Sequence, residues 1–464
     1  SRRQRQMCIR DSTLTHSKEK FSPINKEEVR IYSCGPTVYK DATIGNMRTN
    51  IFQDTLRRTL EYNGLKVKQA MNITDVGHLV SDGDEGEDKM IKSARQEGKE
   101  PLEIANYYTK LFFKDLENLN IEIPEIICRA TDNIEDMLKA VEDLVKRGYA
   151  YETSSAIYFD ISKLDKYPIL SNLDIENQKA GARVEVDKEK RNPHDFAVWI
   201  KAPENHLMKW NSPWGPSYPG WHIECSVMSK KYLGEVFDIH TGGIDLIPTH
   251  HENEIAQSKG MCGKIPANYW MHGEFLLING GKMSKSLGNV YLLQDIIDRG
   301  YEPLVYKLFC YSIQYRKKLN FTWEGMDSAK ISLDRLREAY QKHLNGTDEI
   351  DENILEQYKN NFNEAINDDL NMPVAMSVVW ELAKRPEKSK KVSQLLKDFD
   401  RVLGLKIDEY KKQNIPDEIK ELLKQREEAR KNKDWSESDK LRDIIKEKGY
   451  IVKDSKEGQT IEKA

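Results

Sequence analysis

The sequence predicts an α/β protein whose functional site lies at one edge of a parallel sheet. Residues 29–33 have the pattern of a short strand, and apolar positions at helical spacing follow over residues 51–60. Residues 67–73 then form a second candidate strand, which completes a β-α-β unit. A further candidate strand, residues 236–240, ends in glycines. Because ligands of parallel sheets bind beyond the carboxyl ends of the strands, we expect the site there.

The chain of 464 residues is long enough for several domains. Its first twenty residues are basic and polar, so we expect a disordered tail outside the fold. Helical and short strand patterns interrupt the sheet domain, which is therefore expected in two parts around an insertion. The expected boundaries are 1–20 for the tail, 21–101 and 203–275 for the sheet domain, 102–202 for the insertion, 276–302 for a lysine-rich loop segment, 303–405 for a helical bundle and 416–464 for a compact C-terminal domain.

Composition limits the classes of protein to which the chain can belong. Apolar residues make up 38% and charged residues 32%, and no apolar run approaches the roughly 20 residues that cross a bilayer. We therefore expect no membrane association. The net charge of −4 gives no overall basic surface, so any nucleic-acid site must be a local patch. The six cysteines form no close pairs, which is typical of a reducing compartment, and we expect the cytoplasm.

Two lysines are the most informative residues of the chain. Lys282 and Lys285 lie three positions apart in a loop that carries hydroxyl groups and is bounded by Gly281 and Gly288. Two ammonium groups on a mobile loop can close on a triphosphate as charge develops during group transfer. A solvated polar turn is the alternative for any single lysine pair. The five-residue string 282–286 favours the phosphate clamp.

Small and polar residues follow two of the candidate strands. Gly242 and Gly243 allow the backbone to approach a ligand, and Asp245 just beyond them can hold ribose hydroxyls. A plain tight turn explains this segment equally well. We expect Thr37, Thr43, Gly45 and Asn46 to lie in the crevice beyond the carboxyl end of the first strand.

A third group of residues combines possible metal ligands. Thr249 begins a capping-box pattern, so we expect a helix on which His250 and Glu254 lie one turn apart on the same face. Such a pair can chelate a divalent ion, and thiolates from Cys34 and Cys225 would complete a tetrahedral zinc shell. Sequence spacing leaves their convergence open. A lone cysteine is often a buried apolar residue, and a His-x-x-x-Glu pair is often a surface pair.

Five segments together resemble cysteinyl-tRNA synthetases, which are class I aminoacyl-tRNA synthetases. They are Cys34-Gly35-Pro36-Thr37-Val38-Tyr39, Asn72-Ile73-Thr74-Asp75, Gly220-Trp221-His222-Ile223-Glu224-Cys225-Ser226, His250-His251-Glu252-Asn253-Glu254 and Lys282-Met283-Ser284-Lys285-Ser286. They occur in the family's order, and the similarity extends from about Phe21 to the C-terminus. The resemblance implies a Rossmann-like catalytic domain with an inserted connective domain, then a helical bundle and a small α+β or helical anticodon-binding domain.

The resemblance also implies the site residues, motif by motif. One Zn²⁺ ion per chain would be held by Cys34, Cys225, His250 and Glu254. The amino acid would lie against Gly35, Thr37, Thr74, Trp221 and His240. ATP would bind at Gly45, Gly242, Gly243, Asp245 and Lys285. Catalysis would use Lys282, Lys285, Thr43 and Asn46, and the anticodon would contact Arg430, Trp435, Asp439 and Asp454.

The implied reaction joins L-cysteine to tRNA(Cys). The cysteine carboxylate would attack ATP, bound with Mg²⁺, and the resulting cysteinyl-adenylate would pass its cysteinyl group to the 3′-terminal adenosine of the tRNA. Cysteine and serine differ by one atom, and a simple pocket separates such analogues by only about 1–3 kcal/mol. Zinc prefers a thiolate to a hydroxyl, so selection can occur on binding. The family resemblance also implies a monomer.

One signature departs from the family's pattern. The usual His-Ile-Gly-His or His-Ile-Gly-Asn is replaced by Thr43-Ile44-Gly45-Asn46. A threonine hydroxyl can donate a hydrogen bond, but it cannot carry the charge of an imidazolium. We expect either a larger contribution from the lysine loop or a slower enzyme.

Trp435 is the most informative residue of the C-terminal segment, because it stands among basic residues just after a predicted helix. RNA-binding proteins stack splayed bases on such rings. A tryptophan that pins a helical hairpin is the alternative explanation.

Two other functions are compatible with parts of the sequence. The cysteine ligase of mycothiol synthesis resembles the family in its zinc site but lacks the C-terminal module, so residues 430–454 favour tRNA. A catalytically inactive RNA-binding paralogue would keep that module and carry a degenerate first signature, as Thr43 suggests.

Overall fold

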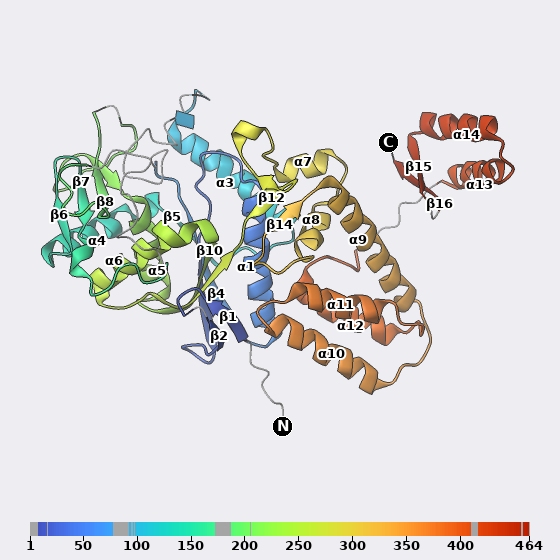
Figure 1. Cartoon of the computed structure of the whole chain (residues 1–464), viewed down its shortest axis with the longest axis horizontal. Coiled ribbons are helices and arrows are strands. Elements are labelled where there is room, and N and C mark those ends of the chain that lie inside the picture. The colour runs from blue at the N-terminus through green and yellow to red at the C-terminus, as the bar shows by residue number, and fades with distance from the viewer. Residues whose placement is uncertain are drawn as a thin grey trace. The chain divides into compact units, whose positions relative to one another are not determined.

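A five-stranded parallel sheet forms the centre of the computed structural model (Figure 1). Its strand order is β11-β10-β3-β4-β5, and each neighbouring pair is parallel. The strands are β3 (Glu28–Ser33), β4 (Lys66–Ile73), β5 (Ile126–Arg129), β10 (Phe237–Gly243) and β11 (Ala267–Gly273). The structure describes residues 8–15, 17–77, 92–93, 96, 98–171, 187–204, 206–409, 416–455 and 458–463. This sheet confirms the predicted α/β class.

Helices cover both faces of the sheet. They are α1 (Ile44–Tyr62), α3 (Pro101–Asn118), α4 (Ile134–Lys146), α5 (Trp221–Leu233) and α6 (Glu252–Cys262). Ile31 of β3 packs in the apolar cluster that holds Leu56 of α1, whereas Tyr32 packs in the cluster that holds Ile223 of α5. Successive residues of a strand point to opposite faces, so α1 and α5 lie on opposite sides of the sheet.

Within the predicted disordered tail, residues 8–15 and 17–20 are instead ordered, while residues 1–7 and 16 lie outside the described residues. β1 (Cys8–Ser12) and β2 (Ser17–Lys20) pair as an antiparallel hairpin. The backbone N–H of Thr13 donates to the carbonyl of Trp270 at 2.9 Å, so the hairpin is fastened to β11. Polar composition concealed this contact, because it depends on a backbone hydrogen bond, the Thr13 hydroxyl and the single apolar side chain of Leu14.

The inserted part also begins later than residue 102. β5 hydrogen-bonds to β4 over residues 126–129, so α3 and β5 belong to the parallel-sheet domain. A strand of four residues carries too little periodicity to be assigned from sequence. The insertion contains an antiparallel sheet of order β6-β7-β8-β9, which extends past residue 202. Its strands are β6 (Ala150–Glu152), β7 (Ala156–Phe159), β8 (Phe196–Lys201) and β9 (Ser217–Pro219).

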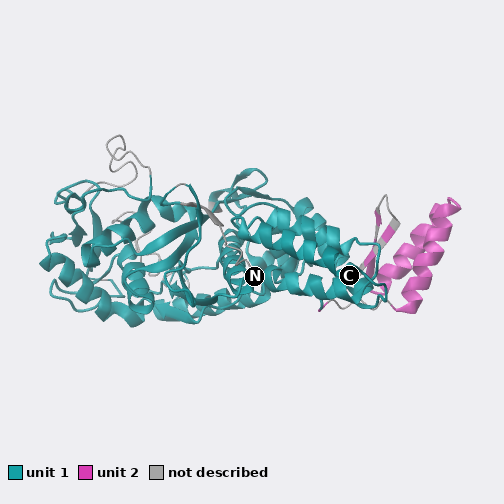
Figure 2. Cartoon of the chain, turned by 90° about the horizontal axis from the view of Figure 1, so that it is seen from below, with its two compact units in different colours: residues 1–408 teal, residues 409–464 magenta. Residues whose placement is uncertain are grey.

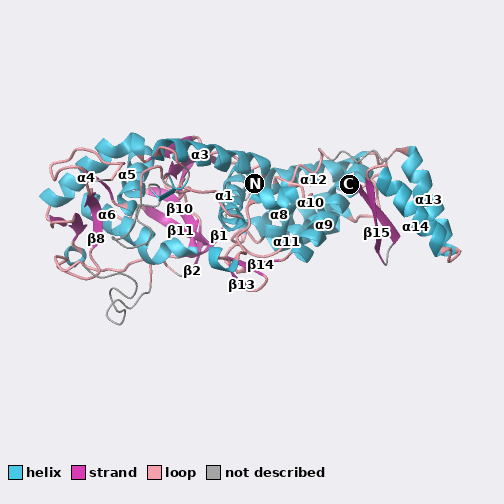
Figure 3. Ribbon diagram, turned by 90° about the horizontal axis from the view of Figure 1, so that it is seen from above, coloured by secondary structure: helices cyan, strands magenta, loops and turns pink. Residues whose placement is uncertain are grey.

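The lysine loop lies at a small sheet whose last strand comes between two helices, α8 and α9, of the C-terminal half of the larger unit (Figure 3). This sheet has the order β13-β12-β14, with β12 (Leu276–Ile278), β13 (Gly281–Lys282) and β14 (Leu319–Phe321). Asn279 and Gly280 both have positive φ, as a two-residue hairpin turn requires. The following helices are α7 (Leu293–Asp298), α8 (Pro303–Cys310), α9 (Trp323–Leu344), α10 (Glu352–Asn367), α11 (Met372–Ala383) and α12 (Lys390–Leu403).

Residues 409–464 form a second compact unit, separate from residues 1–408 (Figure 2). It consists of α13 (Asp417–Lys431), α14 (Trp435–Glu447), β15 (Tyr450–Ser455) and β16 (Gly458–Lys463). Arg426 is fully buried and donates from both guanidinium nitrogens to the carboxylate of Asp454, at 2.9 Å each. Among the described helices of the whole chain, none combines the length and the apolarity needed to span a bilayer.

Candidate active site

The four expected metal ligands come from four separate elements. Cys34 directly follows β3, Cys225 lies in α5, and Glu254 lies in the first turn of α6. His250 precedes α6 in a π-helical turn, Ile247–His251. The capping box predicted at Thr249 is therefore wrong, since α6 begins only at Glu252, after this wider turn. Turns of this kind are frequent at functional sites.

The ligand atoms of Cys34, Cys225, His250 and Glu254 all lie within 4.8 Å of one another. His250 Nε2 is 3.1 Å from Glu254 Oε1, and both side chains are almost fully buried. Zinc in proteins binds sulfur at about 2.3 Å and nitrogen or oxygen at about 2.0–2.2 Å, which places ligand atoms about 3.3–3.8 Å apart. The two sulfurs, the imidazole and the carboxylate thus fit a tetrahedral zinc ion in both donor type and spacing.

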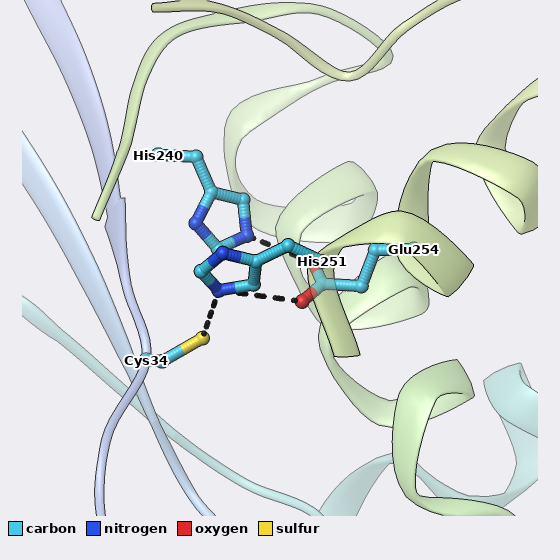
Figure 4. A group of neighbouring side chains, drawn as sticks. All are labelled: Cys34, His240, His251 and Glu254. Atoms are coloured by element: carbon cyan, nitrogen blue, oxygen red, sulfur yellow. Dashed lines mark hydrogen bonds and ion pairs between the residues drawn. The ribbon is translucent and has the colours of Figure 1, made fainter. Parts of the chain in front are cut away.

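Further histidines surround these ligands, and sequence reasoning gave only one of them a place in the site. His251 Nε2 is 3.2 Å from Cys34 Sγ, and His240 Nε2 is 2.8 Å from Glu254 Oε2 (Figure 4). Together with Cys34 and Glu254, these two histidines form a second group able to hold a metal. His222 Nδ1 is 3.0 Å from His250 Nδ1. The sequence contained a signal for His222 and His251, since His222 is in the same motif as Cys225 and His251 directly follows His250.

Burial and mutual contacts determine the charge state of the cluster. Burial opposes charge on Glu254, but His240 and His250 lower the pKa of its carboxyl to about 2. Burial likewise opposes charge on His250, but Cys225 and Glu254 raise its pKa to about 10. Burial raises the pKa of both thiols, that of Cys225 well above its ordinary value. Because zinc binds thiolates, metal binding at this cluster is coupled to release of protons.

The residues expected to contact the amino acid lie next to this cluster. A side chain at Gly35 would collide with the carbonyl oxygen of Asn72, at 1.8 Å from an added Cβ, so only glycine fits there. Thr37 and Thr74 form a parallel bridge, and the Thr74 hydroxyl donates to Glu224 Oε2 at 2.8 Å. The ring of Trp221 lies 4.4 Å from that of His250.

His240 lies deeper than the other residues of this group. Its side chain is fully buried, and its ring stacks on Trp270 with centroids 4.5 Å apart. Its Nε2 atom is engaged by Glu254. The structure therefore brings His240 to the carboxylate of the candidate metal site.

The residues expected to bind the nucleotide, Gly242, Gly243 and Asp245, lie at the carboxyl end of β10 and just beyond it. A Cβ on Gly242 would lie 2.7 Å from His251 Cε1, and one on Gly243 would lie 2.3 Å from Asp245 Oδ1. Gly242 is thus required by the buried ring of His251, whereas the exposed side chain of Asp245 could move away from a Cβ at position 243. Asp245 is exposed beyond them.

The first signature and the lysine loop lie side by side. Thr43 caps α1 in a capping box with Asn46, in which the Thr43 hydroxyl donates to Asn46 Oδ1 at 2.8 Å. The backbone N–H of Ile44 donates to the carbonyl of Tyr291, 2.9 Å away. A Cβ on Gly45 would lie 3.7 Å from Met283 Cε.

The two lysines follow Gly281 on this loop. Lys282 is exposed in β13, and Lys285 begins a short helical turn, Lys285–Leu287. The side chain of Lys285 lies outside the described part of the chain. Asn289 shapes the loop, since its Oδ1 accepts from the Ser284 N–H and its Nδ2 donates to the Lys282 carbonyl.

The expected anticodon residues lie in the second unit and are treated within it. Trp435 is 58% exposed, so it does not pin the helical hairpin. The guanidinium of Arg430 lies 5.8 Å from the Trp435 ring and also pairs with Asp454. Asp454 is thus shared by two arginines, while Asp439 pairs only with Arg442 among the described ion pairs.

Comparison with solved structures identifies the class of fold. The chain is similar to Mycobacterium tuberculosis methionyl-tRNA synthetase in complex with methionyl-adenylate, with a TM-score of 0.54 and 14% identity over 82% of this chain and 90% of that one. It is also similar to LeuRS of Agrobacterium radiobacter K84 in a ternary complex with tRNA and LeuAMS, with a TM-score of 0.59 and 11% identity over 83% and 84% of the two chains. The fold is that of a class I aminoacyl-tRNA synthetase.

Sequence comparison defines the family within this class. Residues 20–331 match the class I (C) tRNA synthetase catalytic domain, 361–408 the DALR domain and 412–461 the cysteinyl-tRNA ligase anticodon binding domain. The chain is 44% identical to the cysteine–tRNA ligase of Treponema denticola, over 96% of this chain and 97% of that protein. It is 42% identical to a cysteine–tRNA ligase of Thermus thermophilus, over 96% and 97%. The chain belongs to the cysteine–tRNA ligase family.

Proposed function

We propose that this protein is a cysteine–tRNA ligase that activates L-cysteine with ATP and transfers it to the 3′-terminal adenosine of tRNA(Cys). The convergence of two cysteines, a histidine and a glutamate beside the nucleotide crevice carries this proposal. Membership of the family supports it independently.

We propose that Cys34, Cys225, His250 and Glu254 hold one Zn²⁺ ion. When bound, zinc supplies a soft Lewis acid that accepts the thiolate of cysteine in preference to the hydroxyl of serine. Trp221, beside His250, would close the pocket, and Gly35, Thr37 and Thr74 would form its wall. Because no side chain fits at Gly35 beside the Asn72 carbonyl, the backbone there would line the pocket directly.

We propose that ATP, carried with Mg²⁺, lies across the carboxyl ends of the strands. Gly242, Gly243 and Asp245 would hold the nucleoside, and Gly45 would lie under the phosphates. Lys282 and Lys285 would stabilise charge on the triphosphate as pyrophosphate leaves, because compact ammonium groups on a loop can close at that stage. Thr43 and Asn46 would fix the first turn of α1 beside the phosphates, which their capping box supports.

In the C-terminal unit we propose that Trp435 stacks on an anticodon base, with Arg430, Asp439 and Asp454 beside it. The 58% exposure of the Trp435 ring supports this role, because an exposed aromatic face is free to stack on a base. The resemblance to cysteinyl-tRNA ligase anticodon binding domains over residues 412–461 supports it as well.

One chain carries every group that the reaction requires, so we propose that it acts as a monomer. The free cysteines of the described chain agree with a cytoplasmic location.

ATP–pyrophosphate exchange on the full chain tests the adenylation step. We expect exchange with L-cysteine and at least a hundredfold less with L-serine. Charging of a tRNA with a GCA anticodon then tests the transfer step. Exchange without charging would favour the mycothiol type of cysteine ligase, and tRNA binding without exchange would favour an inactive paralogue.

A further inference from the structure

A line of hydrogen bonds connects the N-terminal hairpin to the candidate metal ligand Cys34. The Thr13 hydroxyl lies 2.7 Å from His272 Nδ1, and His272 Nε2 lies 2.7 Å from His251 Nδ1. The other nitrogen of His251, Nε2, lies 3.2 Å from Cys34 Sγ. Each imidazole in this line therefore uses both of its ring nitrogens.

The surroundings of this line keep its geometry fixed. The His251 side chain is completely buried, and that of His272 is 4% exposed. The backbone of Thr13 is fastened to β11 through its bond to the Trp270 carbonyl, and His272 stands two residues further along that strand. Residues two apart on a strand share a face, so Trp270 and His272 both point to the metal cluster, where Trp270 stacks on His240.

The chemistry of a metal-bound cysteine gives the line a direction. The facing nitrogens of His272 and His251 are 2.7 Å apart, so one hydrogen lies between the two rings. A neutral imidazole donates from one nitrogen and accepts at the other. A metal-bound thiolate can only accept, so His251 Nε2 must donate to it. His251 Nδ1 then accepts from His272 Nε2, and His272 Nδ1 must accept from the Thr13 hydroxyl.

We propose that Thr13 is a positioning residue of the metal centre, whose hydroxyl sets the tautomers of His272 and His251 so that His251 donates to the Cys34 thiolate. This inference rests on the metal site proposed above. The β1–β2 hairpin, which precedes the residues that match the family's catalytic domain, would then help to orient a metal ligand. Partners that orient metal ligands in this way commonly change metal affinity when they are removed.

Two substitutions at Thr13 separate the hydroxyl from the shape of the side chain. Thr13→Val keeps the β-branched shape and loses the donor, whereas Thr13→Ser keeps the donor. Direct partners of metal ligands change affinity about 10–100-fold, so for a partner two rings away we expect Thr13→Val to weaken zinc binding about 3–10-fold. Thr13→Ser should stay within about twofold of the wild type, because the hydroxyl is retained.

The measurement is zinc affinity of the full chain by competition with a chromophoric chelator. The cobalt-substituted proteins give a second readout, since the intensity and position of the thiolate-to-cobalt absorption report on hydrogen bonding to the sulfur. We expect Thr13→Val to shift this band and Thr13→Ser to leave it in place. Thermal unfolding of the metal-free proteins checks that both variants fold alike.

The outcomes distinguish this inference from the proposed function. A wild-type chain that binds no zinc overturns the metal site itself. A wild-type chain that binds zinc, with equal affinity and an equal cobalt spectrum in Thr13→Val and Thr13→Ser, overturns only the role of Thr13. If Thr13→Val unfolds, His272→Gln takes its place, and an unchanged cobalt band in that variant contradicts the inference.

Discussion

Single residues in this chain have chemical roles that depend on partners far away in the sequence. Cys34 and Cys225 come from opposite halves of the sheet domain, yet their sulfurs lie within 4.8 Å of the other candidate ligands. The carboxylate of Glu254 is held on one side by His250 and on the other by His240. A ligand with a supported second oxygen keeps its orientation before the metal arrives.

The first prediction concerns the sulfur ligands. Cys225→Ala should abolish bound zinc, because removal of a thiolate leaves an incomplete shell. Cys262→Ala is the matched control, since this cysteine ends α6 and its thiol donates only to the Ser258 carbonyl and contacts the Ser258 hydroxyl. Elemental analysis of both purified variants is the measurement. Equal zinc in the two proteins would contradict the ligand assignment.

The second prediction concerns the unusual first signature. Thr43→His should leave ATP–pyrophosphate exchange intact or raise it, because an imidazole can add charge stabilisation beside the phosphates. Loss of the threonine cap should cost α1 only about 1 kcal/mol. Thr43→Ser, which keeps the cap, is the control for folding. A loss of exchange of more than tenfold in Thr43→His alone would show that this loop does not align with the family's signature.

At the level of elements, one arginine joins α1 to the starts of two neighbouring strands, β12 and β14, in the small sheet that carries the lysine loop. Arg48 is 5% exposed, and its guanidinium donates to the carbonyls of Glu274 and Phe275, which precede β12. The same group donates to the carbonyl of Lys317, which precedes β14. These bonds fix the small sheet against the helix that carries the first signature.

The third prediction concerns this arginine. Arg48→Met should lower the free energy of unfolding by about 2–3 kcal/mol, because it removes the charge-assisted hydrogen bonds of a buried guanidinium to the carbonyls of Glu274, Phe275 and Lys317. Lys264→Met is the matched control, because Lys264 is more than half exposed and pairs with Glu235 at the surface, where a loss should stay within about 0.5 kcal/mol. Urea unfolding of both variants is the measurement. Similar urea midpoints for the two variants would show that the hydrogen bonds of Arg48 do not stabilise the fold.

At the scale of the whole molecule, the proposed adenylation site and the proposed anticodon contacts lie in two different compact units. The larger unit contains the candidate metal, amino-acid and nucleotide residues. The smaller unit has its own core, with Ile419, Leu441 and Ile445 buried around the pair of Arg426 and Asp454. Changes on the surface of the smaller unit should therefore affect tRNA recognition without altering adenylation.

The fourth prediction tests this division. Trp435→Ala should lower kcat/KM for charging of tRNA about 5–150-fold, because stacking of a base on an aromatic ring contributes about 1–3 kcal/mol. Cysteine-dependent pyrophosphate exchange should be unchanged. Ile123→Ala, which removes another exposed apolar side chain but in the larger unit, should affect neither assay. Equal charging of tRNA by Trp435→Ala and the wild type would contradict the proposed contact between Trp435 and the anticodon.

Much of the architecture could be read from local patterns. Alternating strand and helix patterns and long helical periodicity predicted the parallel sheet and the bundle, since each pattern repeats over many residues. Short or polar elements escaped this reasoning. β5 is only four residues long, and the β1–β2 hairpin joins the fold through a backbone bond, one hydroxyl and one leucine, which form no periodic apolar pattern.

The sequence by itself determined the chemistry available to this protein: two thiols, an imidazole and a carboxylate in recognisable strings, and a lysine loop that marks its class. Only the tertiary structure decided that these groups meet, that His240 and His251 reach the same ligands, and that Thr13 lies at the end of a line from Cys34. The reason is physical. Residue type sets which bonds a side chain can make, whereas convergence depends on strand order and helix packing, which are properties of the whole chain.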